Sequence, residues 1–524
     1  MKLREAKPVV LVALLLAAFA INLDTTIVNV ALPTLVRELH ASTTQLEWIV
    51  DAYNLLFAAF VLAAGNLGDR AGRKGVLLCG LAVFGAASFA GGLGSSPGEL
   101  IAARAVMGLG AALIFPATLS LLTNVFTDRR ERARAIGLWG ASTGVGIAVG
   151  PIVGGWLLEH FAWSSVFFAL VPLAAIAVVL VAVAVPTSRD PTAPPADRLG
   201  LILSTAAMAV LIYSIIEAPA RGWGAPLSVL GFAVATVLVV AFVAWERRTR
   251  VPMLDVALFR NLRFSAASAA VTITFFSLMG FIFVITLYFQ FLKGYGPLST
   301  GVRLLPVATM VGITSVLGTR IAVRRGTKLV VASGLLSLAL GLAWASTSST
   351  STSYLSIAGS MILIGTGIGL TGAPATESIM GAVPVAKAGV GSAINDATRI
   401  LGGTLGVAVI GSIYASLYAR HLVQALPGDL PGSIANGAQR SVGIALGAAD
   451  RLDAVGRPVA ARGLHDAATS AFFEGFQTAV LVAAGIALAG MLVALALIPN
   501  QPPQASAVPA DPQIRVTGQA QTDP

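Results

Sequence analysis

The feature that most constrains this chain is a succession of long apolar segments separated by short polar ones. Segments such as 9–32, 75–95 and 164–185 are long enough to span a membrane, because about 20 residues cross the hydrocarbon core. Similar segments recur along nearly the whole length. The sequence therefore predicts an all-α polytopic membrane protein.

Composition agrees with this prediction. Hydrophobic residues make up 56% and charged residues 11% of the 524 residues, whereas a soluble domain carries about 25% charged residues. The net charge is +10, but the basic residues fall in short loops between apolar segments, where they set membrane topology. We therefore expect membrane lipids as partners and no nucleic acid.

Fourteen spans are predicted, at residues 9–32, 45–66, 75–95, 99–125, 135–158, 164–185, 200–217, 226–245, 266–290, 301–322, 328–346, 353–378, 397–417 and 472–497. An even number places both termini on one side of the membrane. One set of loops is rich in arginine and lysine, and the opposite short loops offer little beyond Arg37, Arg221 and Lys293. By the positive-inside rule, both termini are cytoplasmic.

Two regions are expected outside the bilayer. Residues 418–471 form a long external loop that is rich in alanine and glycine. Residues 499–524 form a Pro/Gln-rich tail, which we expect to be disordered and cytoplasmic.

A glycine-and-charge stretch, GNLGDRAGRKG at 65–75, follows the second span. Its R-x-G-x-K pattern at 70–74 returns at 324–328, after the tenth span, and transporters are often built from such repeats. We infer two six-helix halves separated by an inserted pair of helices, a 6+2+6 arrangement. The N-terminal half, inserted pair and C-terminal half comprise residues 1–186, 187–253 and 254–498.

The same stretch predicts a cytoplasmic gate. Its first two glycines allow close approach of a neighbouring helix, and Gly72 allows a backbone with positive φ. Asp69 can accept a bond from a helix N-terminus or pair with an arginine across the interface between the halves. The alternative is a basic loop that only sets topology. The candidate gate residues are Gly65, Gly68, Asp69, Arg70, Gly72 and Arg73.

This stretch resembles the signature of the loop between spans 2 and 3 in the major facilitator superfamily. Four further stretches resemble signatures of its fourteen-span drug/proton antiporter family: LDTTIVNVALP at 23–33, RAVMGLGAALIFPATLSLL at 104–122, GIAVGPIVGG at 146–155 and AGVGSAINDATRILGGTLGVAV at 388–409. The resemblance covers about residues 10–495. It implies the major facilitator fold with fourteen spans and proton-coupled export, and it leaves the substrate open.

The fifth span carries two rows of small residues at four-residue spacing, 140–144–148 and 146–150–154. Such rows let membrane helices pack backbone to backbone, and a proline there adds a kink. Tight packing alone explains the pattern. The resemblance associates it with a bending interface and with the direction of export. The residues concerned are Gly146, Gly150, Pro151, Gly154 and Gly155.

Ionisable side chains inside the spans are costly and by default functional. On the first span, one face clusters four polar residues as a candidate cavity lining: Asn22, Thr25, Thr26 and Asn29. Asp24 points nearly the opposite way. It either bonds a neighbouring helix or couples transport to protons.

Four further charged residues are candidates for coupling or substrate binding. Asp51 is either a water-exposed interfacial acid or the acid that the family carries in its WIVDxY stretch. Arg104 has to find a carboxylate or carbonyls, and the resemblance makes it part of a proton relay. Asp396 either pairs with Arg399 three residues on or, by the resemblance, binds a proton or cation. Glu217, at the end of span 7, is interfacial or a weaker candidate.

No enzyme signature competes with transport. A P-loop is absent from the sequence, the single Cys79 excludes a cysteine cluster, and the four histidines lack metal-ligand spacing. We expect no metal and no cofactor, with the proton motive force as the energy source.

We therefore expect a bacterial inner-membrane antiporter that exports amphipathic or cationic drugs or antimicrobials while protons enter. It would act as a monomer on small-molecule substrates. A dedicated exporter of one endogenous metabolite or lipid is the alternative. Less favoured are an importer and a non-transporting membrane sensor or scaffold.

Overall fold

The computed structural model describes residues 7–189, 197–252, 254, 256–382, 388–426 and 430–499, and within these ranges the long regular elements are all helices. Two sequence-predicted features lie outside them: the tail from residue 500 onward, and the side chain of Asp69 within its helix.

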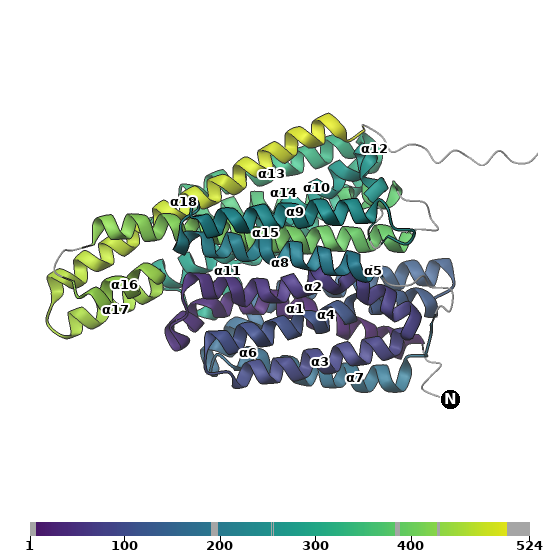
Figure 1. Ribbon diagram of the computed structural model, residues 1–524, viewed down its shortest axis with the longest axis horizontal. Coiled ribbons are helices and arrows are strands. Elements are labelled where there is room, and N and C mark those ends of the chain that lie inside the picture. Colours follow the sequence, from purple (N-terminus) through teal and green to yellow (C-terminus); the bar gives the residue numbers. More distant parts are fainter. Residues whose placement is uncertain are drawn as a thin grey trace, which may run out of the picture.

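The first seven helices form an N-terminal bundle at the bottom of Figure 1. They are α1 (Lys7–Leu39), α2 (Thr43–Ala71), α3 (Arg73–Leu93), α4 (Pro97–Val125), α5 (Arg129–His160), α6 (Ser165–Phe168) and α7 (Leu170–Ala184). Capping residues in the sequence define where α2 and α4 begin. Ser42 and Gln45 form a capping box at the start of α2, and Ser96 caps α4 ahead of Pro97, so backbone N–H groups at these ends are bonded.

The C-terminal bundle is built from the second half of the chain, in teal, green and yellow in Figure 1. Its elements are η2 (Val256–Arg260), α10 (Leu262–Leu287), η3 (Tyr288–Leu292), α11 (Pro297–Arg303), α12 (Leu305–Arg325), α13 (Thr327–Ser346), α14 (Tyr354–Gly381), α15 (Ala388–Ala425) and α18 (Pro458–Leu497). Within it, α10 packs on α15, and α13 packs on α14 and α18.

An inserted pair of helices, α8 (Arg198–Arg221) and α9 (Pro226–Glu246), joins the two bundles. α8 contacts both α2 of the N-terminal bundle and α15 of the C-terminal bundle. Apolar side chains from all three helices, among them Leu55, Ile212 and Ala408, form a small buried cluster there. The pair therefore bridges the two bundles.

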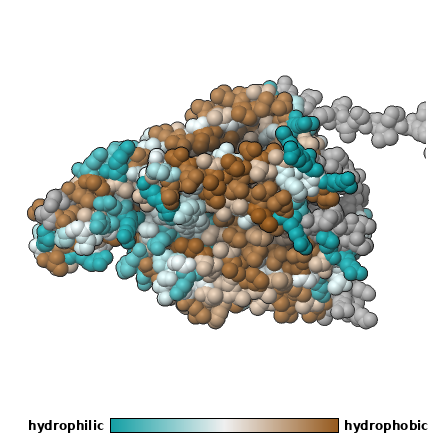
Figure 2. Space-filling model, in the orientation of Figure 1, coloured by the Kyte–Doolittle hydropathy of each residue, from teal (hydrophilic) through white to brown (hydrophobic). Residues whose placement is uncertain are grey.

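The predicted membrane-spanning fold is confirmed. Thirteen described helical segments are long and apolar enough to cross a membrane. α2, with 29 residues, lies beside them against α4 and α15, and it completes the predicted fourteen. Figure 2 shows a broad apolar belt between two more polar ends. Large side chains such as Val237, which is 66% exposed, belong to this lipid-facing surface.

Residues 418–471 differ from the expected loop. α15 continues to Ala425, and the chain then forms α16 (Gly432–Arg440) and α17 (Val442–Ala454) before α18 begins. Alanines at 438, 445 and 449 are buried against these neighbours, so small side chains permit close helix packing rather than an irregular loop. This hairpin marks one end of the molecule, the α16–α17 end, and the α2–α3 junction marks the other, the Gly72 end (Figure 1).

The repeated R-x-G-x-K pattern has one geometry at both places. Gly72 has φ +114° and ends α2 while beginning α3. Gly326 has φ +92° and stands in the same way between α12 and α13. Both values lie where residues with a Cβ are strained, so the predicted positive φ is confirmed at Gly72 and recurs at Gly326.

Replacing Gly72 with alanine is expected to cost about 1–3 kcal/mol of stability. A Cβ at this position meets nothing within 4 Å, so the whole effect comes from the backbone angle. Gly75 is the matched control, because it also has open space and lies in the first turn of α3. Thermal unfolding followed by tryptophan fluorescence should show a lower Tm for Gly72→Ala only. Equal Tm values would contradict the argument.

Candidate functional site

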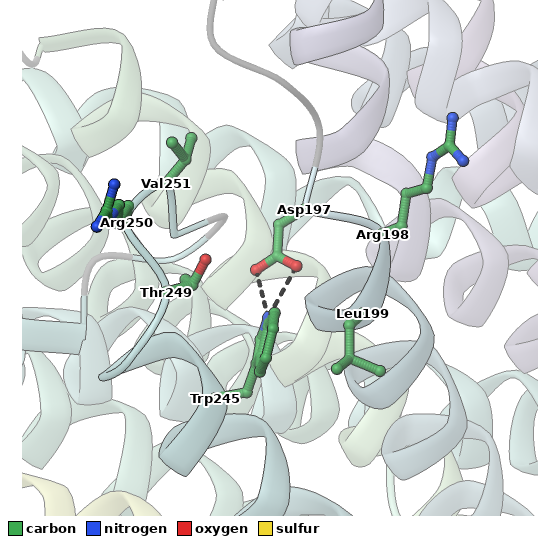
Figure 3. Close-up of a pocket in the computed structure, with 7 residues that line it drawn as sticks. All are labelled: Asp197, Arg198, Leu199, Trp245, Thr249, Arg250 and Val251. Atoms are coloured by element: carbon green, nitrogen blue, oxygen red, sulfur yellow. Dashed lines mark hydrogen bonds between the residues drawn. The ribbon is translucent and has the colours of Figure 1, made fainter.

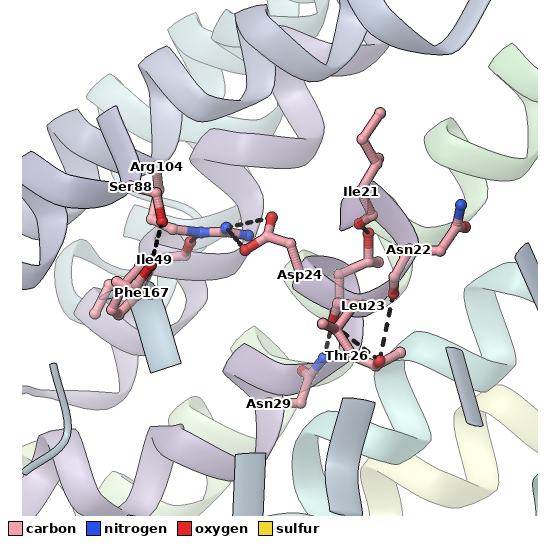
Figure 4. A network of polar contacts seen from close by, with 11 residues as sticks. Ile21, Asn22, Leu23, Asp24, Thr26, Asn29, Ile49, Ser88, Arg104 and Phe167 are labelled. Carbon is pink, nitrogen blue, oxygen red and sulfur yellow. Dashed lines mark hydrogen bonds and ion pairs between the residues drawn. The ribbon is translucent and has the colours of Figure 1, made fainter. Parts of the chain in front are cut away.

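A buried ion pair lies at the centre of the N-terminal bundle (Figure 4). Arg104 of α4 donates from Nη1 to both carboxylate oxygens of Asp24 on α1, at 2.8 and 2.7 Å, and both side chains are at most 1% exposed. Its Nε donates to the carbonyl of Ile49 on α2 at 3.0 Å. Its guanidinium also lies 4.2 Å from the centre of the Tyr53 ring. One arginine thus links three helices.

On α1, Asn22 and Thr26 point away from Asp24 (Figure 4). Asn22 and Thr25 are partly exposed, whereas Thr26 and Asn29 are buried. All four side chains donate to carbonyls of their own helix. Asn22 and Thr25 therefore keep a surface available to a ligand, and Thr26 lies beneath Gly150 of α5.

Two more carboxylates are buried one helical turn apart on α2. Glu47 and Asp51 are both 0% exposed. Oε2 of Glu47 lies 3.1 Å from the hydroxyl of Ser412 on α15. Oε1 of Glu47 and both oxygens of Asp51 have no hydrogen-bond partner. Asp51 is thus not a water-exposed acid in this conformation.

The remaining acids are less enclosed. Asp396 lies 3.9 Å from Nη1 of Arg399, as the three-residue spacing predicts, with 15% of its side chain exposed. That guanidinium lies 4.6 Å from the ring centre of Phe275 on α10. Glu217 pairs with Arg221 at 3.5 Å near the end of α8.

The glycines of α5 contact both bundles. A Cβ on Gly146, Gly150 or Gly154 would meet α1 of the same bundle, at 3.0, 2.0 and 2.6 Å. Gly155 instead packs on Leu298 of α11, and the backbone of Pro151 packs on Gly301. The row 146–150–154 therefore fixes α5 to α1, and the next positions touch the other bundle.

The candidate gate residues lie at the Gly72 end. Gly65 faces Pro116 of α4, and Gly68 faces Arg73. The backbone N–H of Arg73 donates to the carbonyl of Ser188 after α7, and Arg70 is exposed. These contacts hold the turn within its own bundle.

Contacts between the bundles gather at the α16–α17 end. Gln290 of η3 donates to the carbonyl of Val30 at 2.9 Å and accepts from Arg37 at 3.4 Å. Glu159 of α5 accepts from the N–H of Leu298 at 3.1 Å. With the glycine contacts of α5, these bonds close this end of the interface.

A surface pocket of about 360 Å³ lies elsewhere, at the end of the inserted pair (Figure 3). Asp197 caps α8 through the N–H of Gly200 and accepts from the indole of Trp245. These bonds stabilise the pair, and Glu246, a buried acid at the end of α9, lies beside Asp197 against Gly200. In the part of the chain that the structure describes, no group of three His, Cys, Asp or Glu side chains is arranged to hold a metal.

Sequence reasoning missed three participants in this network. Glu47 stands four residues before Asp51, a spacing that places both on one helix face, so this signal was available. Tyr53 and Gln290 carried none, because their roles depend on which helices face each other.

Comparison with known proteins agrees with the fold. The model of the Major Facilitator Superfamily matches residues 14–407. The multidrug efflux pump LfrA of Mycolicibacterium smegmatis is 34% identical, over 93% of this chain and 95% of LfrA. The multidrug resistance protein Stp of Mycobacterium tuberculosis is 36% identical over 80% of this chain and 78% of Stp.

A solved structure shows the same fold at low identity. A bacterial homologue of the human lysosomal transporter Spinster, in an inward-facing and unoccupied conformation, is 15% identical with a TM-score of 0.63, over 94% of this chain and 98% of that chain. The family match, the relatives and the fold agree: this chain belongs to the Major Facilitator Superfamily of membrane transporters.

Proposed function

We propose that this protein exports amphipathic or cationic drugs from the bacterial cytoplasm in exchange for protons. The observation that carries the proposal is the set of carboxylates buried within the spans, because such groups are costly to bury and by default mark a functional site. Relatives named for multidrug efflux and resistance support the substrate class, as does the "Tetracenomycin C resistance and export protein" of Streptomyces glaucescens, 34% identical over 78% of this chain.

The arginine-rich loops assign the Gly72 end to the cytoplasm, and both termini with it. The closed α16–α17 end then faces outward, and the conformation is inward-facing. Transport would proceed by rocking of residues 1–186 against 254–498, with 187–253 as the inserted pair and the gate residues meeting when the cytoplasmic side closes. The proton motive force would be the only energy source, and the working unit a monomer in lipid.

Asp396 and Asp24 have different roles in the proposed exchange. Asp396, partly exposed and weakly paired with Arg399, offers a carboxylate that a proton and a cationic drug would compete for. Asp24 is held by Arg104, so its protonation would release the arginine from α1 and change how α1, α2 and α4 pack. Competition at one acid and repacking at the other would couple the two fluxes.

The test uses purified protein in liposomes with an internal pH dye, an imposed proton gradient and ethidium as the substrate. We expect ethidium-driven proton flux in the wild type, a strong loss in Asp396→Asn, and wild-type flux in Asp466→Asn, whose side chain is 84% exposed. The double variant Asp24→Asn/Asp396→Asn should show no ethidium-driven proton flux. Flux retained in all variants would place the coupling elsewhere.

A dedicated metabolite exporter would be silent with a broad panel of cations but would still run with its own substrate. A scaffold would show no proton flux with any compound, and neither Asp24→Asn nor Asp396→Asn would change its function.

A further inference from the structure

The closed end of the interface contains a carboxyl group that the proposed exchange cycle does not use. Glu47 of α2 contacts Ser412 of α15, and Ser412 in turn contacts the carbonyl of Ile215 on α8 at 3.0 Å. Gly411 lies against the same carboxyl group, where a Cβ would approach it to 2.8 Å. Through Ser412, Glu47 of the N-terminal bundle is therefore linked to the C-terminal bundle and to the inserted pair.

The hydroxyl of Ser412 lies within hydrogen-bond distance of two acceptors, Glu47 Oε2 and the carbonyl of Ile215. Within α8, the carbonyl of Ile215 would normally accept from the N–H of residue 219, but that residue is Pro219, which has no N–H. The Ser412 hydroxyl supplies the missing donor. A hydroxyl has a single proton to donate, so it cannot serve both acceptors at once, and while it donates to Ile215 it can only accept from Glu47.

When the hydroxyl donates to Ile215, the 3.1 Å contact with Glu47 is a hydrogen bond only if Glu47 donates, and only the protonated acid can donate. Its other oxygen, Oε1, has no partner in the structure, which a buried carboxylate tolerates far less well than a neutral acid.

The charged residues around Glu47 also favour its protonated form. On α2, Asp51 is buried without a hydrogen-bond partner. On α8, Glu217 is paired with Arg221, and on α4, Arg104 is bound to Asp24. α15 contributes Gly411 and Ser412, which carry no charge. The cations Arg104 and Arg221 are therefore already paired with other acids, and Asp51 adds a second buried acid beside Glu47.

We propose that Glu47 is a proton-binding site that locks the α16–α17 end closed through the chain Glu47–Ser412–Ile215. Protonated, it joins three helices from the two bundles and the inserted pair. When the bundles separate, water reaches the carboxyl group, the proton leaves, and the carboxylate resists reburial. The direction rests on the proposed function: since this end faces outward, external acid closes the gate and external alkali opens it.

This proton differs from the exchanged one. In the inward-facing conformation Glu47 is fully buried at the outer end, so it takes and returns its proton on the outer side only. It controls the gate and carries no charge across the membrane.

The experiment measures the width of this end without requiring transport. Cys79, the single cysteine, is replaced by serine, and spin labels are placed at the exposed positions Ala162 and Ser351, one in each half. Distances are measured by electron–electron resonance in nanodiscs at pH 5.5 and 8.5. We expect the wild type to shift toward longer distances at pH 8.5. Glu47→Gln, which keeps a donor for Ser412, should stay short at both pH values.

Two further variants test the role of the Ser412 hydroxyl and provide a control acid. Ser412→Ala removes only the hydroxyl and should lengthen the distance already at pH 5.5. Glu38→Gln, an exposed acid on the same side, should retain the wild-type shift. A wild type without a shift, a wild-type shift in Glu47→Gln, or an unchanged Ser412→Ala would each overturn the lock. Because no substrate is present, failure of the export assay leaves this result standing on its own.

Discussion

Replacing Arg104 with alanine is expected to lower stability by about 3–5 kcal/mol, because it leaves one partner of a buried ion pair behind. The carboxyl of Asp24 stays fully buried without its cation, and the bond to Ile49 is lost as well. Thermal unfolding followed by tryptophan fluorescence measures the effect. Lys7→Ala is the control, because it breaks a half-exposed ion pair with Glu131, and such pairs contribute about 0–1 kcal/mol.

A double variant separates the structural role of the pair from its role in transport. Asp24→Leu with Arg104→Met removes both charges together, and apolar residues of similar volume often replace a buried pair without loss of stability. We expect Tm to recover while ethidium-driven flux stays absent. Flux restored along with Tm would reduce the pair to a clamp between helices.

Gly301→Ala is expected to prevent closure of the α16–α17 end. A Cβ on Gly301 would lie 2.1 Å from the carbonyl oxygen of Pro151 and 2.6 Å from its carbon. Both are backbone atoms of the other bundle and have no rotamer with which to give way, so α11 and α5 have to separate. The spin-label distance between positions 162 and 351 should lengthen at every pH.

The control for this prediction is Gly312→Ala on the following helix. A Cβ there meets nothing within 4 Å, and alanine is the better helix former. Its distance distribution should match the wild type. A Gly301→Ala distribution that also matches the wild type would mean that the bundles do not depend on this close approach.

Much of the fold follows from the sequence because membrane helices are defined by local properties. Length and hydropathy locate each span without reference to the others. Helical spacing places Asp24 away from Asn22 and brings Asp396 to Arg399. The junction at Gly72 is equally local, since a backbone φ of +114° favours glycine.

Contacts between side chains on different helices could not be predicted from these local properties. Asp24 and Arg104 are 80 residues apart, and no property of either helix says that their faces meet. Glu47 looks interfacial near the start of its span, and it becomes buried only because α15 and α8 pack over it. The helices α16 and α17 were missed because an alanine- and glycine-rich segment has no strong apolar period.

The length of α18 leaves part of this helix beyond the membrane at the α16–α17 end, which the proposed orientation places outside the cell. With 40 residues, the helix is about 60 Å long, roughly twice the hydrocarbon thickness. Gln477 bonds the carbonyl of Ser348 near the end of α13, so the preceding turns stand beyond that level together with α16 and α17. α17 also rests on α1. An antibody fragment bound between these two helices should block the proposed rocking motion from the aqueous phase, without entering the lipid or competing with a drug.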